Sequence, residues 1–155
     1  MNKRIAVAKK ITTTQVICVR RESQNLWEPY YSDVEHIIYD MDLPTSDHIF
    51  RRFIKSLQFH KAAFNRLISL CPKLIYADGF DALCIAAKYK RKDKNVKIVY
   101  EMADIRESFI EKPKSIVKKM TNYILRYSEK IKIRDVNYLI VTSEKFYSEY
   151  YKNLF

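Results

Sequence analysis

The sequence predicts an α/β fold, a parallel sheet of about five strands with helices on both faces. Short runs of β-branched and aromatic residues alternate along the chain with longer segments of helical periodicity, which is the βαβ pattern. The runs are continuously apolar, which is typical of strands buried on both faces. Hydrophobic residues make up 48% of the 155, enough for a core, and one domain over residues 1–155 is expected.

The predicted strands share a high content of Val, Ile, Leu and Tyr. In chain order they cover residues 14–20, 34–40, 73–77, 96–101 and 136–142. Because helical segments separate the last four of these strands, parallel pairing in a Rossmann-like sheet is expected.

Helices are predicted over residues 3–10, 47–70, 81–92, 114–133 and 144–153. Pro72 ends the second of these, because proline cannot continue a helix, and Asp81 is a candidate N-cap of the third. Apolar side chains at steps of three and four predict the buried face of each helix. In the second they are Phe50, Phe53, Leu57, His60, Phe64, Leu67 and Cys71, in the third Ala82, Ile85, Ala86 and Tyr89, and in the fourth Ile116, Met120, Tyr123, Ile124, Tyr127 and Ile131.

The chain is strongly basic, with 29 Lys and Arg against 18 Asp and Glu, a formal charge of +11. The fourth helix carries Lys118, Lys119 and Arg126 around its apolar stripe. One interpretation is docking on an anionic membrane surface, where each basic residue contributes about 1 kcal/mol. Nucleic-acid binding is a second, but no recognition motif supports it and it is not expected. A Lys-rich surface that serves only solubility is the third.

No run approaches the ~18 apolar residues of a membrane-spanning helix, and the N-terminus lacks the apolar segment of a signal peptide. The three cysteines form no CxxC pair, which favours reduced thiols. A cytoplasmic protein, or one peripheral at the inner face of the membrane, is therefore expected. Gly79 is the one glycine, which excludes a P-loop or a Gly-rich dinucleotide fingerprint.

Ligands of parallel α/β sheets bind beyond the carboxyl ends of the strands. The residues there that suit a polyhydroxylated or anionic ligand are Asp78, Phe80, Asp81, Glu101, Asp104 and Arg106. The alternative is that such residues only form solvated loops and helix caps. Asp40 and Asp42 have the DxD spacing that can hold a divalent metal. The solvated strand-end interpretation is preferred for this pair, so no metal or cofactor is predicted.

Three segments carry a resemblance to a known family. In KLIYADGFDALCIAAKYKRKDKNVKIVYEMADIRES, a strand, a polar turn and a small-residue helix lead to a strand ending in VYE. In YSEKIKIRDVNYLIVTSEKFYSEYY, Glu129 on a helix precedes Arg134 and Asp135, a strand and Ser143. The opening RIAVAKKITTTQVICVRR places Arg4 at the start of the first helix. Over essentially the whole chain, these features resemble the N-terminal, acceptor-side domain of family-four-type glycosyltransferases with the GT-B fold.

The departures from that family matter for the predicted sheet. The family begins with a strand and a Gly-rich loop, whereas this sequence starts at the helix, and its usual histidine after VYE corresponds to Ala103. The family's second domain, with most of the nucleotide-sugar site, has no counterpart. Without the first strand, residues 14–20 are expected to pair directly with 73–77. One five-stranded sheet then results, with strands starting near residues 34, 14, 73, 96 and 136.

The resemblance implies hexosyl transfer from a nucleotide sugar to a surface-polysaccharide (capsule) or lipid-linked acceptor, without a metal. The chain would be the acceptor-side half, inactive without its C-terminal partner domain. Gly79, Glu129 and Ser143, with Arg4, would be family motif positions rather than reacting groups. The alternative is a non-catalytic basic α/β module that binds a membrane surface or nucleic acid.

Overall fold

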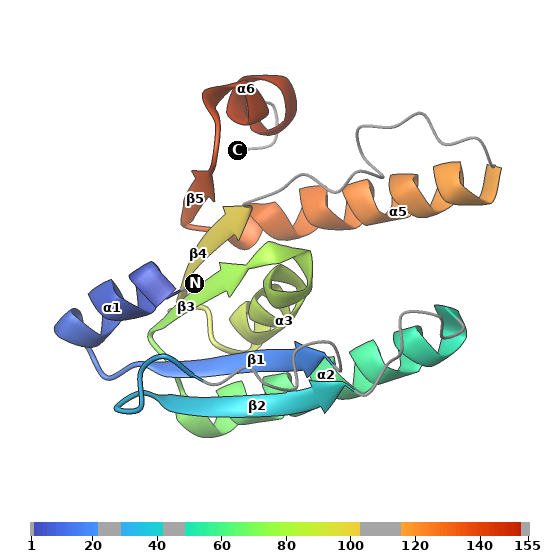
Figure 1. The fold of residues 1–155 in the computed structure, drawn as a ribbon. Coiled ribbons are helices and arrows are strands. Elements are labelled where there is room, and N and C mark those ends of the chain that lie inside the picture. The colour runs from blue at the N-terminus through green and yellow to red at the C-terminus, as the bar shows by residue number, and fades with distance from the viewer. Residues whose placement is uncertain (1, 22–28, 42–48, 103–115, 153–155) are drawn as a thin grey trace. The chain divides into compact units, whose positions relative to one another are not determined.

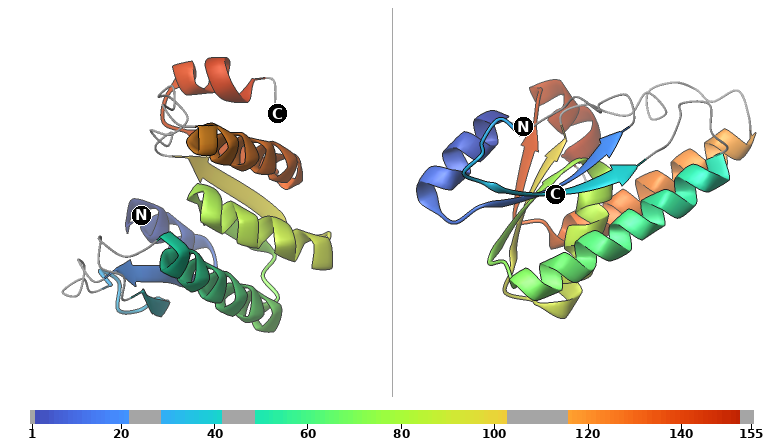
Figure 2. Two further views of the ribbon diagram at one scale, coloured as in Figure 1. Left: turned by 90° about the vertical axis from the view of Figure 1, so that its right-hand side faces the viewer. Right: turned by 60° about the horizontal axis from the view of Figure 1, so that its bottom comes forward.

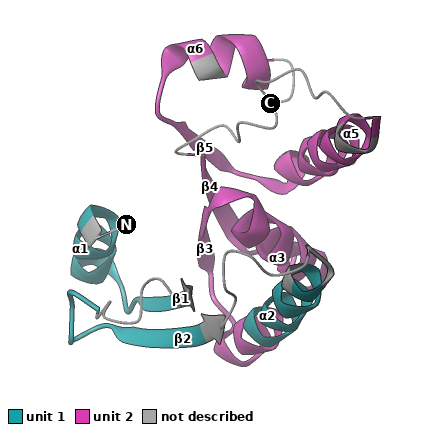
Figure 3. Ribbon diagram, turned by 45° about the vertical axis from the view of Figure 1, so that its right-hand side comes forward, with its two compact units in different colours: residues 1–63 teal, residues 64–155 magenta. Residues whose placement is uncertain are grey.

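The computed structural model describes residues 2–21, 29–41, 49–102 and 116–152. The described residues form parallel strands and helices, with a helix between each pair of consecutive strands from β2 to β5, which confirms the predicted α/β class (Figure 1). Two compact units, residues 1–63 and 64–155, divide the chain (Figure 3).

The first unit is built on a two-stranded parallel sheet. Its elements are α1 (Asn2–Ile11), β1 (Gln15–Arg21), β2 (Glu35–Met41) and the greater part of α2 (Ile49–Leu70). The two strands pair in register from Gln15 opposite Glu35 to Arg21 opposite Met41. Figure 2 shows α2 as one long uninterrupted helix, and it ends before Pro72 as predicted.

The predicted inward face of α2 is only partly correct. Phe53 and Leu57 are 59% and 51% exposed, whereas Ala63 and Leu67 are buried. The Tyr39 ring of β2 meets Phe59 edge to face, with ring centroids 5.6 Å apart. The apolar side chains of α2 project over a wider sector of the helix than one packing surface covers, so some of them remain exposed to solvent.

The second unit is a three-stranded parallel sheet with its connecting helices. Its elements are β3 (Leu74–Asp78), α3 (Gly79–Lys92), β4 (Lys97–Met102), α5 (Ile116–Lys132), the 3-10 turn η2 (Ile133–Asp135), β5 (Tyr138–Val141), α6 (Glu144–Phe146) and the π-helical turn η3 (Tyr147–Tyr151). The strand order is β3-β4-β5, with Asp78 opposite Glu101 and Met102 opposite Val141.

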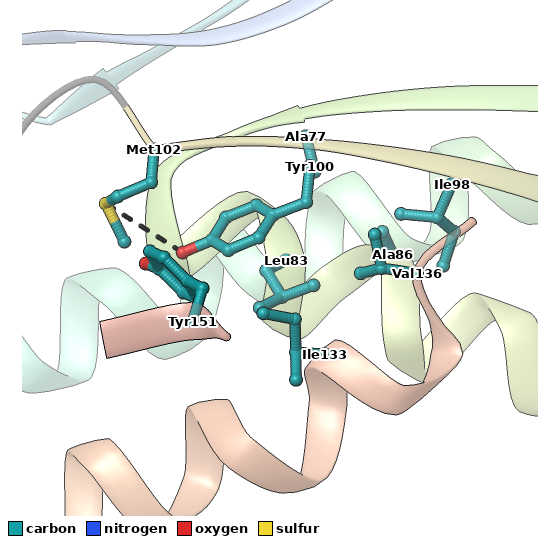
Figure 4. Close-up of a cluster of buried hydrophobic side chains, with 9 residues drawn as sticks. All are labelled: Ala77, Leu83, Ala86, Ile98, Tyr100, Met102, Ile133, Val136 and Tyr151. Atoms are coloured by element: carbon teal, nitrogen blue, oxygen red, sulfur yellow. Dashed lines mark hydrogen bonds between the residues drawn. The ribbon is translucent and has the colours of Figure 1, made fainter. Parts of the chain in front are cut away.

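The core of the second unit lies between this sheet and α3, with η2 and η3 closing it (Figure 4). The strands contribute Ala77, Ile98, Tyr100 and Met102, and the other elements contribute Leu83, Ala86, Ile133, Val136 and Tyr151. The predicted stripe of α3 is confirmed, since Ile85, Ala86 and Tyr89 are buried. Its small side chains let the helix pack closely on the sheet.

The expected burial of the strands on both faces is wrong for this sheet. Burial alternates along β3 and β5, and the opposite face leaves Leu74, Tyr76, Tyr138 and Ile140 between 40% and 63% exposed. The crossovers β3-α3-β4 and β4-α5-β5 advance across the sheet in one direction. Because such crossovers are right-handed, both helices lie on the same face.

The predicted pairing of residues 14–20 with 73–77 is also wrong. Among the described residues, β1 pairs with β2 in one sheet and β3 pairs with β4 in another. Within each sheet, the neighbouring strands are the ones that the predicted order required. Only the predicted pairing between residues 14–20 and 73–77 is therefore wrong. In the doubly wound order these two strands are not neighbours, because the first strand of that fold lies between them.

Candidate functional site

The carboxyl edge of β3, β4 and β5 gathers several of the residues predicted to bind a ligand. Asp78 ends β3 and is the N-cap of α3, with extended backbone and no side-chain capping hydrogen bond. Asp81, predicted as this cap, instead lies exposed in the first turn of α3. The helix starts earlier than expected because Gly79, with a φ of +78°, makes the left-handed turn that joins strand to helix.

Glu101 is the buried member of this group. It pairs in register with Asp78 of the neighbouring strand, and register partners in a parallel ladder point to the same face. Its side chain is 2% exposed, and its Oε2 accepts a hydrogen bond from the Tyr76 hydroxyl. A buried carboxylate needs such donors, because an unsatisfied one is costly to desolvate.

The loop after β5 reaches the same edge of the sheet. Thr142 and Ser143 follow the end of the strand, where Val141 pairs with Met102. Ser143 is half-buried and its carbonyl accepts a hydrogen bond from the Tyr147 N–H at 3.3 Å, which starts the final helical turns. Phe80 is half-buried, with the Lys132 amine 5.9 Å from its ring centroid.

The structure therefore brings Asp78, Phe80, Asp81 and Glu101 to one edge, with Ser143 on the loop beside it. A Cβ built on Gly79 would meet nothing within 4 Å, so the space above the turn is open. Carboxylates beside open space can accept hydrogen bonds from the hydroxyls of a sugar. Asp104 and Arg106 lie outside the described residues, as does Asp42 of the DxD.

Glu129, a motif position of the resemblance, is the centre of a second polar cluster. Its carboxylate is fully buried and accepts hydrogen bonds from the hydroxyls of Tyr100 at 2.8 Å, Tyr150 at 3.0 Å and Tyr151 at 3.0 Å. Burial, and next the Glu129 charge, raise the pKa of all three phenols above the ordinary value of 10.0. We call these four residues the tyrosine cluster. It ties α5 to β4 and η3, and its role is structural.

Sequence reasoning missed the partners of both buried carboxylates. Tyr76 and Tyr100 were visible only as apolar strand residues, and Tyr150 and Tyr151 as a helical segment. A buried glutamate needs hydrogen-bond donors. Because the resemblance marks the position of Glu129, that residue could have indicated from the sequence that donors such as tyrosine hydroxyls must lie nearby.

The remaining predicted residues lie elsewhere. Arg4 is exposed on α1 in the first unit. Lys119 and Arg126 are exposed on α5, and the side chain of Lys118 is outside the described part of the chain. Among the described residues, no helix combines the length and hydropathy needed to cross a membrane.

The predicted inward face of α5 is wrong. All six apolar residues expected in the core are between 47% and 82% exposed, namely Ile116, Met120, Tyr123, Ile124, Tyr127 and Ile131. The helix instead turns Glu129 inward, and Ile133 of the adjoining η2 enters the core. Three hydrogen bonds to the buried carboxylate fix this rotation.

Comparison with protein-family models, curated proteins and solved structures gives no match to this chain.

Proposed function

We propose that this chain is the acceptor-side half of a glycosyltransferase, which binds a glycan or lipid-linked acceptor of hexosyl transfer in the cytoplasm. The observation that carries the proposal is the polar carboxyl edge, where the exposed carboxylates of Asp78 and Asp81 lie beside an open turn. Parallel α/β sheets bind their ligands at this edge. Carboxylates suit an acceptor, because they accept hydrogen bonds from sugar hydroxyls.

The buried Glu129 supports the same reading. The resemblance places a glutamate on the long helix before Arg134, Asp135, a strand and a serine, and the described chain has that succession as α5, η2, β5 and Ser143. The nucleotide-sugar donor would be held by a second domain of the full enzyme. The assignment of the acceptor to this chain and of the donor to a second domain is what the resemblance implies.

Saturation-transfer NMR with short glycans and a soluble lipid-linked saccharide tests the proposal. We expect millimolar binding, of order −4 kcal/mol, that is lost in the double variant Asp78→Asn, Asp81→Asn. Asp93→Asn is the matched control, because Asp93 caps the opposite end of α3. A signal that survives the double variant, or that Asp93→Asn weakens equally, would contradict the proposal.

A non-catalytic basic binding module is the second candidate. It is favoured by one observation, the exposed apolar and basic surface of α5. Absence of any glycan signal together with strong binding through α5 would favour this second function over the first.

A further inference from the structure

The surface of α5 that faces solvent carries an apolar stripe, whereas the helix turns the carboxylate of Glu129 toward the core. Its six exposed apolar residues recur at steps of three, four or one, so they form one stripe along the helix. We call it the α5 stripe, made of Ile116, Met120, Tyr123, Ile124, Tyr127 and Ile131. The rings of Tyr123 and Tyr127 stack within it, with an interplanar angle of 9° and centroids 6.3 Å apart.

The helix cannot roll to bury this stripe without losing the tyrosine cluster. Glu129 faces the core opposite the stripe, and its three hydrogen bonds come from β4 and η3. The Lys132 amine on the inner side donates to the Ser128 hydroxyl and carbonyl oxygens of the preceding turn. The outward orientation of the stripe is therefore set by interactions that are costly to break.

Basic side chains border the stripe. Lys119, Arg126 and Lys130 are all exposed. At about 100° per residue, these three lie within roughly 60° of one edge of the stripe. Glu129 is the one acidic residue of α5 and it is buried, so the exposed surface of this helix carries positive charge only.

We propose that α5 docks in the plane of an anionic lipid bilayer, with the stripe at the boundary between headgroups and acyl chains. Lys119, Arg126 and Lys130 would then lie at the level of the lipid phosphates. Charge complementarity selects this occupant, because an apolar face bordered by Lys and Arg matches an anionic lipid surface. A helix of 17 residues spans only about 25 Å and carries five basic residues, which suits lying on a bilayer rather than crossing it.

The tyrosines suit the same environment. A tyrosine ring is apolar while its hydroxyl remains hydrated, so it favours the membrane interface. Tyr123 and Tyr127 are 70% and 56% exposed and lie at the middle of the stripe. This inference does not rest on the proposed function, because α5 and the carboxyl edge are tested by different ligands.

Sedimentation with lipid vesicles tests the proposal on the whole chain. We expect binding to vesicles that contain phosphatidylglycerol, little binding to pure phosphatidylcholine, and a steep loss near about 0.5 M salt, where the Debye length falls to a few Å. The triple variant Lys119→Glu, Arg126→Glu, Lys130→Glu should bind at least a hundredfold more weakly, since each basic residue contributes about 1 kcal/mol. Its fold is checked by circular dichroism, because Arg126 lies 5.7 Å from the Tyr150 ring centroid of the tyrosine cluster.

The matched control is Lys61→Glu, Lys73→Glu, Lys94→Glu, three exposed residues outside α5 that change the net charge equally. It should retain most of the binding. Equal loss in both triples would mean that net charge rather than α5 carries the attraction, and would overturn the proposal.

A second variant separates a bilayer from other partners. Met120→Ser, Tyr123→Ser, Tyr127→Ser keeps every charge, and its fold is checked by circular dichroism because all three side chains are exposed. We expect it to lose vesicle binding at least tenfold. Three outcomes would each overturn the proposal. The first is vesicle binding that this variant leaves unchanged, and the second is tighter binding of the unaltered chain to duplex DNA than to vesicles. The third is that the unaltered chain does not bind lipid but forms a dimer, and that this variant is monomeric.

Discussion

At the residue scale, Glu129 holds three parts of the second unit together through one buried carboxylate. Tyr100 belongs to β4, whereas Tyr150 and Tyr151 belong to η3. Removing the acceptor takes the carboxylate away from the buried hydroxyls of Tyr100 and Tyr151, and each buried donor that loses its acceptor costs roughly 1–3 kcal/mol.

We therefore expect Glu129→Ala to lower the free energy of unfolding by about 3 kcal/mol or more, measured by urea denaturation. Glu129→Gln should cost less, because its carbonyl oxygen still accepts. Glu149→Ala is the control, since Glu149 is exposed and only 3.9 Å from Lys145 at the surface, so its effect should be under about 0.5 kcal/mol. Similar losses at the two alanine variants would contradict the role assigned to Glu129.

The same cluster predicts the response to alkaline pH. The folded-state pKa of Tyr100, Tyr150 and Tyr151 lies above the ordinary value, first because burial disfavours the phenolate. Their contribution to stability is therefore complete below pH about 10 and is lost as the pH rises beyond it. Urea denaturation between neutral and alkaline pH should show this fall.

Tyr151→Phe should make the alkaline fall shallower, because one titrating group is gone, while lowering stability at neutral pH through the lost hydrogen bond. Tyr30→Phe, at a residue 74% exposed, serves as the control. Stability that rises above pH about 10 would contradict the assigned direction.

At the element scale, the turn from β3 to α3 depends on Gly79. A side chain there would have open space, so any cost comes from the backbone φ of +78° alone. We expect Gly79→Ala to lower the free energy of unfolding by about 1 kcal/mol, and Gly79→Asn by less, because asparagine tolerates the left-handed conformation better. Equal stability of Gly79→Ala and the unaltered chain in urea would show that the turn relaxes to another conformation.

The elements differ in how far their sequence predicts them. The strands begin and end within one or two residues of the predicted ranges, because runs such as 96–101 combine β-branched and aromatic side chains with polar boundaries. The face of a helix was harder to predict. In α5 the residues from Ile116 to Ile131 look like a core stripe, yet a single buried glutamate on the other side decides the rotation.

At the scale of the whole molecule, the proposed function predicts an absence of activity. Glycosyl transfer in a two-domain enzyme takes place between the domains, and alignment of the reactants can supply ~7–11 kcal/mol of the barrier. We expect the purified chain to turn over no UDP-, GDP- or CMP-sugar with a membrane extract as acceptor. Calorimetry should show donor binding no tighter than millimolar, of order −4 kcal/mol.

Micromolar binding of one sugar nucleotide, or measurable transfer, would show that this chain forms a complete donor site by itself. The expectation of weak binding follows from the residues as well as from the resemblance. Gly79 is the one glycine, so the chain offers no Gly-rich loop that lets the backbone approach a diphosphate closely.

The topology of the sheet allows the position of the candidate site to be predicted, but not the surroundings of its side chains. Parallel strands bring their carboxyl ends to one edge, so Asp78 and Glu101 could be placed together from the sequence alone. The burial of Glu101 and its bond with Tyr76 could not, because they depend on which neighbours cover that side chain.

The α/β class, the parallel neighbours within each sheet and the edge where polar residues gather can all be read from the amino-acid sequence. These follow from local periodicity and from the handedness of crossovers, which act over a few tens of residues. The separate pairing of β1 with β2 and of β4 with β3 and β5, the exposure of apolar residues on β3 and β5, and the outward direction of the α5 stripe required the three-dimensional structure. Such choices depend on long-range packing and hydrogen bonding, as at Glu129, where partners far apart in the sequence must meet.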